Sequence, residues 1–227
     1  MRMTGETKLA SILSMVSVLG GAVPLHAQTA AEPPARETRC AIDGWTNNRF
    51  GEDIPIREHP NASAPVVGRL PVTPESAQNA YGDRLYSVRM DIVGFSGGWL
   101  RIDHASDRYN DTPPGGARRI SSPSGWMPAD GVRFQIQSAF GYDTPSLAGR
   151  KILDLANDWA TDIGAIERVL ACNGSWVLVD LRLTHRRIGD RLIEFGNEQQ
   201  TIRRAWFRDV CGNEETTCQT PRQGGGD

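Results

Sequence analysis

Residues 94–102 read Gly-Phe-Ser-Gly-Gly-Trp-Leu-Arg-Ile, and residues 171–179 read Ala-Cys-Asn-Gly-Ser-Trp-Val-Leu-Val. Each stretch contains a glycine turn followed by a strand that begins with tryptophan and alternates its side chains. A second tryptophan strand follows each of them. Trp126 comes 27 residues after the tryptophan of the first stretch, and Trp206 comes 30 residues after that of the second. Because a fixed order of motifs recurring at one period indicates duplicated structure, the sequence predicts two small β-domains in tandem.

The amino-terminal residues predict an export signal. Arg2 and Lys8 give a basic start, and an apolar stretch without charge follows over residues 9–23. A small-residue cleavage site ends the segment at Ala27, so residues 1–27 are predicted to be a signal peptide. A retained anchor is the alternative, although the stretch is shorter than the roughly 20 residues of a membrane span. The signal implies an exported protein, periplasmic or secreted, without membrane insertion after cleavage.

Composition and the repeat divide the rest of the chain. Residues 28–39 are rich in alanine, proline and glutamate, which predicts a flexible lead-in. Residues 219–227 contain three consecutive glycines, which predicts a disordered tail. Between them we expect two domains, residues 40–136 and a more degenerate second unit over residues 137–218.

The charge of the chain argues against nucleic-acid binding. The net charge is −2 at pH 7, and loss of the signal peptide, which holds two basic residues and one acidic residue, changes it to −3. General nucleic-acid binding requires a basic surface instead.

All four cysteines lie after the signal peptide. An even number of cysteines in an oxidising compartment predicts two disulfides. A metal site does not fit the spacing, because no Cys-x-x-Cys pair occurs and no histidine lies near a cysteine. We therefore expect neither a metal nor another cofactor.

Strand geometry predicts how the cysteines pair. If the two tryptophan strands of the second half form an antiparallel hairpin, the start of the first strand faces the end of the second. This arrangement brings Cys172 close to Cys211 and leaves Cys40 to pair with Cys218. The other set, Cys211–Cys218 with Cys40–Cys172, stays open.

Strand patterns dominate the chain. Alternation between turn residues predicts strands over residues 54–57, 66–70, 85–95, 99–103, 125–128, 132–137, 166–172, 176–183 and 201–210. Polar residues predict an exposed loop over residues 107–125 and a long hairpin over residues 184–197. The apolar spacing in residues 157–165 is also compatible with a short helix, but the repeat and Gly164 favour a loop.

These segments resemble a known family. Residues 56–70 read Ile-Arg-Glu-His-Pro-Asn-Ala-Ser-Ala-Pro-Val-Val-Gly-Arg-Leu, which resembles the opening strand, turn and strand of a bacterial SH3-like (SH3b) domain. Residues 97–102 and 125–127 resemble its two later tryptophan strands. In the second half, only the later strands match clearly, at residues 175–179 and 205–207.

The end of the ordered chain, residues 206–218, also resembles exported two-module SH3-like proteins of proteobacteria. The resemblance implies an all-β fold of two tandem SH3-like small β-barrels with short helical turns. The chain departs from the family pattern at Ala205, which replaces the usual glycine, and in the insertions at residues 107–124 and 184–200. The resemblance carries no activity with it.

Catalytic motifs are absent from the sequence. It contains no Gly-x-Ser-x-Gly elbow, phosphate loop or His-Glu-x-x-His pair. Asp103, His104 and Ser106 are close in sequence, but neighbouring residues of a strand point to opposite faces, which argues against catalysis. We therefore expect no enzyme; a hydrolase that depends on His104 or His185 is a rival hypothesis.

Binding is the remaining function. Small β-barrels bind extended peptides in aromatic-lined grooves. The tryptophans that begin strands are assigned to the core: Trp99, Trp126, Trp176 and Trp206. The candidate ligand-binding residues are other aromatic residues: Trp45, Tyr86, Phe95, Tyr142 and Trp159.

These inferences predict an exported, monomeric, non-catalytic binding module of the cell envelope. Its expected partner is a cell-wall peptide from peptidoglycan or an envelope protein. The alternative is a periplasmic protein inhibitor or neutralising factor, which would act through an exposed loop such as residues 184–200.

Overall fold

The computed structural model describes residues 36–74, 76–78, 82, 85–107, 120 and 124–212. The predicted signal peptide (residues 1–27), the predicted tail (residues 219–227) and most of the predicted loop over residues 107–125 lie outside them. Strands are the main secondary structure of the described chain, and its helices are single turns, which confirms the predicted all-β class. Closure of its sheets into two SH3-like barrels stays a prediction.

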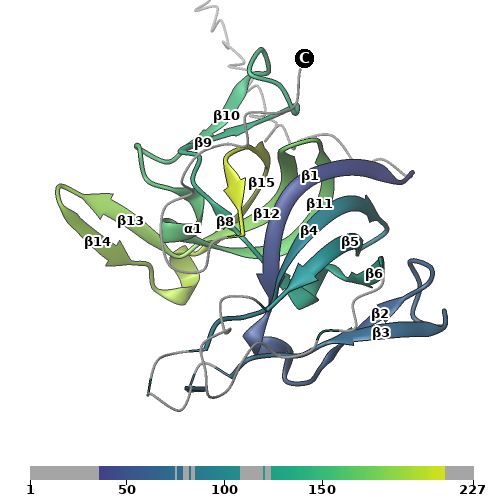
Figure 1. The fold of residues 1–227 in the computed structure, drawn as a ribbon. Coiled ribbons are helices and arrows are strands. Elements are labelled where there is room, and N and C mark those ends of the chain that lie inside the picture. The colour runs from purple at the N-terminus through teal and green to yellow at the C-terminus, as the bar shows by residue number, and fades with distance from the viewer. Residues whose placement is uncertain are drawn as a thin grey trace, which may run out of the picture.

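The first sheet has seven strands in the order β3-β2-β6-β5-β4-β1-β7 (Figure 1). Its strands are β1 (Thr38–Thr46), β2 (Ile54–Arg57), β3 (Val66–Leu70), β4 (Arg89–Ser96), β5 (Trp99–Ser106), β6 (Gly125–Pro128) and β7 (Val132–Arg133). The predicted flexible lead-in ended at residue 39, but β1 already begins at Thr38, because it pairs there with Phe95 of β4. By contrast, the strand predicted over residues 85–95 begins later than expected, at Arg89 of β4.

The second sheet has five strands in the order β10-β9-β15-β12-β11. They are β9 (Phe140–Tyr142), β10 (Lys151–Asp154), β11 (Gly164–Asn173), β12 (Trp176–Leu183) and β15 (Thr201–Phe207). β12 and β15 are antiparallel, with Val177 opposite Phe207, as the tryptophan strands of the second half predicted. β12 therefore lies inside the sheet, between β15 and β11, and β11 lies at the edge.

Two small pairs of strands stand apart from these sheets. The predicted hairpin over residues 184–197 forms β13 (His185–Ile188) and β14 (Arg191–Glu194), which project from the molecule at the left of Figure 1. β8 (Gln135–Ile136) pairs with β16 (Val210–Cys211). The last described strand thus returns to the segment that connects the two sheets.

Helical structure in the described part of the chain is confined to single turns. The segment over residues 157–165, for which a loop was favoured, contains the helix α1 (Ala160–Ile163). Its turn forms because the backbone N–H groups of Asp162 and Ile163 donate to the carbonyl of Trp159, while Ala160 and Ile163 are buried. The remaining turns are the 3₁₀-helices η1 (Asn48–Phe50), η3 (Ala129–Gly131) and η4 (Asn197–Gln199). In the described residues, no helix has the length and apolar character needed to cross a bilayer.

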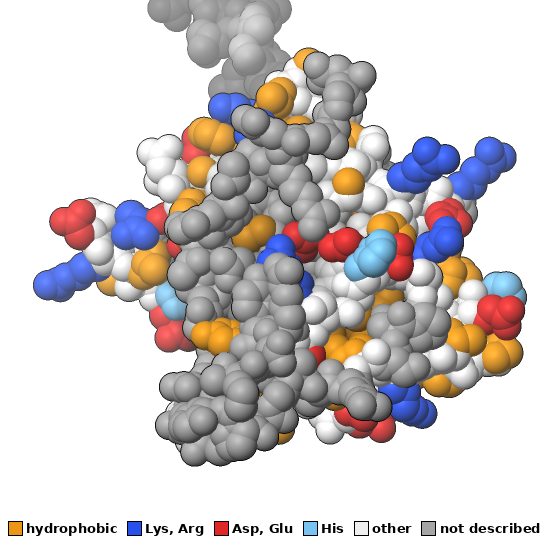
Figure 2. Space-filling view, in the orientation of Figure 1, with side chains coloured by type: hydrophobic (Ala, Val, Ile, Leu, Met, Phe, Trp, Pro, Cys, Tyr) orange, Lys and Arg blue, Asp and Glu red, His pale blue; other side chains and the backbone are white. Residues whose placement is uncertain are grey.

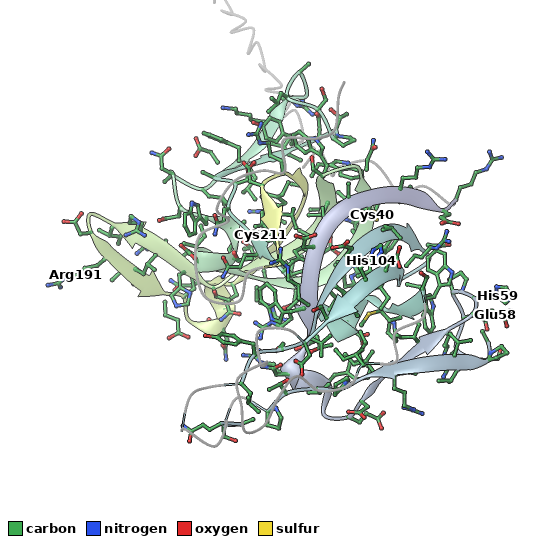
Figure 3. All side chains as sticks on the ribbon, in the orientation of Figure 1. Cys40, Glu58, His59, His104, Arg191 and Cys211 are labelled. Atoms are coloured by element: carbon green, nitrogen blue, oxygen red, sulfur yellow. A yellow bond between two sulfur atoms is a disulfide. The ribbon has the colours of Figure 1, made fainter. Side chains whose placement is uncertain are left out.

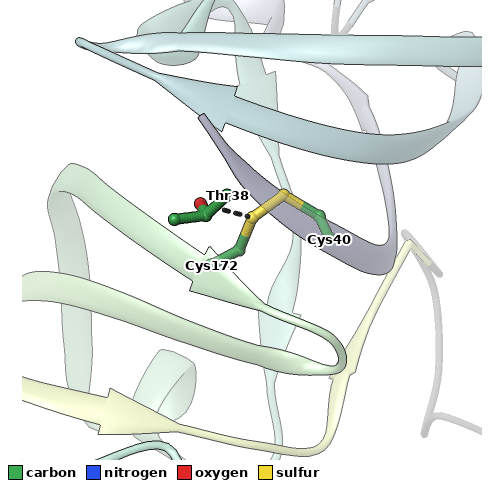
Figure 4. Close-up of a disulfide and its surroundings, with 3 residues drawn as sticks. All are labelled: Thr38, Cys40 and Cys172. Carbon is green, nitrogen blue, oxygen red and sulfur yellow. Dashed lines mark hydrogen bonds between the residues drawn. A yellow bond between two sulfur atoms is a disulfide. The ribbon is translucent and has the colours of Figure 1, made fainter. Parts of the chain in front are cut away.

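A disulfide between Cys40 of β1 and Cys172 of β11 joins the two sheets (Figure 4). Their Cα atoms are 5.3 Å apart, and the hydroxyl of Thr38 lies 3.7 Å from the sulfur of Cys172. Gly174 extends the junction, because its N–H donates to the carbonyl of Arg39 and its carbonyl accepts from the N–H of Ala41. The strands are therefore linked both covalently and by backbone hydrogen bonds.

This disulfide corrects the predicted pairing of Cys172 with Cys211 and of Cys40 with Cys218. Cys172 belongs to β11, and β12 separates β11 from β15 in the sheet. The chain then turns at Asp209, whose φ is +55°, and β16 leaves the sheet to pair with β8. Cys211 is also disulfide-bonded, and Cys218 lies outside the described residues.

The buried side chains of both sheets form one continuous apolar cluster. Ile92 and Leu100 contribute to it from the first sheet, and Leu178 and Phe207 from the second; all four are fully or almost fully buried. The predicted core position is confirmed for the tryptophans at 126 and 206, which are buried, whereas those at 99 and 176 are half-buried. The shared core therefore holds the two sheets together.

Candidate functional site

A cleft of about 1100 Å³ lies between the two sheets. One wall consists of η1, the turn between β4 and β5, η3, β7 and β8. The other wall consists of α1 and the first seven residues of β11. The volume is in the range of sites that hold small ligands or short peptides.

Aromatic side chains form the apolar part of this cleft. Trp45, Phe95 and Phe134 line it and are themselves almost fully buried. Trp45 is held from both sides, because in β1 it lies opposite Arg89 of β4 and Arg133 of β7. These aromatic groups are therefore fixed by the fold, and each exposes only a small part of its surface to a ligand.

The cleft brings together two of the five predicted ligand-binding residues, Trp45 and Phe95. The other three lie elsewhere. Tyr142 is buried and packs edge-on against Trp176, with ring centroids 5.3 Å apart. Trp159 is half-buried immediately before α1, and Tyr86 is half-buried with its carbonyl accepting a hydrogen bond from Thr73. A ligand-binding role stays a prediction for all five.

Charged side chains surround the apolar part. The cleft is lined by three arginines and three acidic residues: Arg49, Arg133, Arg168, Asp130, Asp162 and Glu167. Glu167 accepts a hydrogen bond from Arg182 at 2.7 Å. Arg49 is exposed, and its guanidinium forms no ion pair within the described part of the chain. The cleft therefore contains a positive charge that is available to a ligand.

The buried carboxylate of Asp180 fixes Arg168 in the cleft. Asp180 of β12 is almost fully buried, and its oxygens accept hydrogen bonds from Arg168 at 2.5 and 3.0 Å and from Arg204 at 2.8 and 3.2 Å. Burial raises the pKa of Asp180, but the hydrogen bonds and positive charges of Arg204 and Arg168 outweigh burial, so the pKa lies below its ordinary value. The guanidinium groups of Arg168 and Arg204 thus share the carboxylate of Asp180.

The acidic side of the cleft is joined to the projecting hairpin. Asp158 is buried, and its Oδ1 accepts a hydrogen bond from Arg187 of β13 at 2.5 Å. Its Oδ2 is buried without a hydrogen-bond partner among the described residues. Burial, together with the negative charge of Asp158, raises the pKa of Asp162. Asp162 thus takes up a proton at a higher pH than a free aspartate does.

The Asp180 cluster was not among the predicted site residues. The one available signal is a single aspartate inside the apolar strand Trp-Val-Leu-Val-Asp-Leu-Arg-Leu of β12. A buried acidic residue requires a partner, but the sequence does not say which of the many arginines supplies it. The register of the strands identifies both partners, because Asp180 of β12 lies opposite Arg168 of β11 on one side and Arg204 of β15 on the other.

Asp103 and His104 are closer together than predicted. His104 has a φ of +48°, which breaks the alternation of β5, and its Nδ1 lies 3.4 Å from Oδ2 of Asp103 and 3.5 Å from Oδ2 of Asp91 (Figure 3). The hydrogen bond that Ser124 donates to Asp103 is the main cause of the lowered pKa of Asp103. The serine thus bonds to the carboxylate and not to the imidazole, which is not the order of a nucleophilic triad.

No group of three or more potential metal ligands occurs within the described ranges of the chain. Comparisons with protein-family models, with curated proteins and with solved structures find no match to this chain.

Proposed function

We propose that this protein is an exported, non-catalytic binding module of the cell envelope, and that the cleft between its sheets recognises a peptide of peptidoglycan or of an envelope protein. The observation that carries the proposal is the combination of fixed aromatic groups, Trp45 and Phe95, with the arginines Arg49 and Arg168 in one cleft. Aromatic grooves suit extended peptides, and guanidinium groups suit their carboxylates.

The disulfides support the compartment in this proposal. Disulfide bonds persist in the periplasm and outside the cell, and are rare in the cytosol. Cys40, Cys172 and Cys211 are all disulfide-bonded. Together with the predicted signal peptide, they favour a periplasmic or secreted protein.

Co-sedimentation with purified sacculi tests this function. We expect the oxidised protein to sediment with sacculi and to be released by soluble muropeptides. Replacing Arg49 by Glu is expected to weaken retention by roughly tenfold, because it reverses the unpaired charge of the cleft. The matched control is Arg191→Glu, the same change at the outer end of the hairpin (Figure 3). Absence of retention, or equal loss in both variants, would contradict the proposal.

The inhibitor hypothesis depends on a different surface. The hairpin formed by β13 and β14 exposes large apolar side chains, with 53% of Ile188, 43% of Leu192 and 39% of Ile193 accessible. Figure 2 shows apolar, basic and acidic side chains together where this hairpin projects. A projecting apolar hairpin is suited to insertion into a groove of another protein. In that case Ile193→Ser would abolish one-to-one binding of an envelope protein, and Arg49→Glu would not.

The attachment of the hairpin can be tested directly. Arg187→Ala leaves the buried carboxylate of Asp158 without its partner, so we expect unfolding to become easier by about 1–3 kcal/mol. Amide hydrogen exchange in β13 should also become faster. Arg191→Ala, at an exposed position on the same hairpin, serves as the control and should change stability by less than about 0.5 kcal/mol. Similar effects of the two variants would argue against attachment of the hairpin through the pair of Arg187 with Asp158.

A further inference from the structure

One wall of the cleft is an unpaired sheet edge. Among the described strands, β11 is the last of the second sheet and pairs with β12 alone, apart from the bridge between Gly174 and Cys40 beyond its end. In the part of the chain that the structure describes, no hydrogen bond joins the backbone of residues 165–170 to anything outside β12. All six of these residues line the cleft. Such an edge can accept another strand.

The opposite wall also ends in a sheet edge. β7 takes the last position in the order of the first sheet and pairs only with β1 in the described chain. Val132 and Arg133 of β7 line the cleft together with the next two residues. The cleft is therefore a gap between the last strands of two sheets, with the aromatic residues at one side of it.

The irregularity of β11 limits what can pair with it. Its register against β12 shifts between Ile166 and Arg168 and again between Val169 and Ala171, which places extra residues at Glu167 and Leu170. Bulges bend a strand and interrupt continuous pairing, and they prevent association with a long flat strand. An edge that is both bulged and enclosed in a cleft suits a peptide of a few residues better than the sheet of another folded protein.

The charges of the cleft indicate a ligand with carboxylates. Arg49 has no ion pair within the described residues, and Arg168 shares Asp180 with Arg204. Of the acidic residues that line the cleft, Glu167 is bonded to Arg182, whereas Asp130 is exposed and forms no ion pair with a described residue. The exposed guanidinium of Arg49 therefore suits a carboxylate of the ligand.

We infer that β11 binds a short, extended, carboxylate-bearing peptide as an added strand, with its main chain bonded to residues 165–170 and a carboxylate at Arg49 or Arg168. This inference rests on the proposed function and names its binding mode. Main-chain pairing supplies affinity that does not depend on side chains, and the arginines and aromatic groups then select the peptide.

Amide hydrogen exchange tests the added strand, with monomeric muropeptides released from sacculi by lysozyme as the probe. We expect saturating probe to slow exchange in residues 165–170 by roughly tenfold or more. β10, which is the other edge of the same sheet, is the matched control and should not change. Calorimetric titration of the same samples establishes whether the probe binds.

The outcomes separate the two proposals. Binding without protection of residues 165–170 would overturn the added strand and leave the proposed function standing. Absence of binding by the muropeptides and by intact sacculi would overturn both. The same muropeptides with amidated carboxylates test the ligand chemistry: we expect them to bind roughly tenfold more weakly, and equal affinity would contradict recognition by the arginines.

Discussion

Replacement of Cys40 and Cys172 together by alanine is expected to lower the free energy of unfolding by about 3–5 kcal/mol. The two cysteines are 132 residues apart in the sequence, so their bond removes much of the freedom of the unfolded chain. Both side chains are also buried in the cluster shared by the two sheets. The bond joins β1 to β11 where these strands meet, so its loss should also weaken binding in the cleft at temperatures below unfolding.

Urea denaturation of the oxidised proteins measures this effect. Thr38→Val is a suitable control, since it removes the hydroxyl beside the sulfur of Cys172 but leaves the disulfide in place. We expect this control to differ from the wild type by less than about 1 kcal/mol. A loss below that value in the double variant would mean that hydrogen bonds and apolar packing alone hold β1 against β11.

Local pattern predicts most of the strands in this chain. Local pattern places β2, β3, β6 and β12 within a residue of their observed ends, and among these four strands β2 alone alternates regularly in burial. The start of β4 was placed too early because Val88 bonds instead to Thr46, through both its N–H and its carbonyl. Contacts of this kind depend on the partner strand, so the alternation of residues within one segment does not predict them.

The disulfide and the cleft depend on strand order, which local pattern does not contain. The antiparallel pairing of β12 with β15 was predicted and is confirmed. It did not lead to the correct partner of Cys172, because that residue lies on the far side of β12 and faces β1. The free edge of β11 was missed for the same reason. Aromatic composition identified Trp45 and Phe95, but could not separate them from aromatic residues that the fold places elsewhere.

Replacement of Asp180 by Asn is expected to lower the free energy of unfolding at pH 7 by about 2–4 kcal/mol. The carboxylate is nearly inaccessible and lies between Arg168 of β11 and Arg204 of β15, so its loss removes the counter-charge that the two guanidinium groups share. Because Arg168 is largely exposed, it can turn toward water, which keeps the loss below that of a fully buried pair. Glu167→Gln, which removes the more exposed pair with Arg182, should cost less than about 1 kcal/mol.

The pH dependence distinguishes this charge effect from a simple packing defect. The pKa of Asp180 is lower in the folded protein than its ordinary value of 3.8, so the unfolded chain takes up the proton first as pH falls. Stability from the Asp180 carboxylate is therefore complete above about pH 4 and is lost as pH falls from there through the folded pKa. We expect the difference in unfolding free energy between wild type and Asp180→Asn, measured in urea from pH 6 to pH 2.5, to shrink below about pH 4. A difference that stays constant over this range would mean that the carboxylate charge does not hold Arg168 at the cleft.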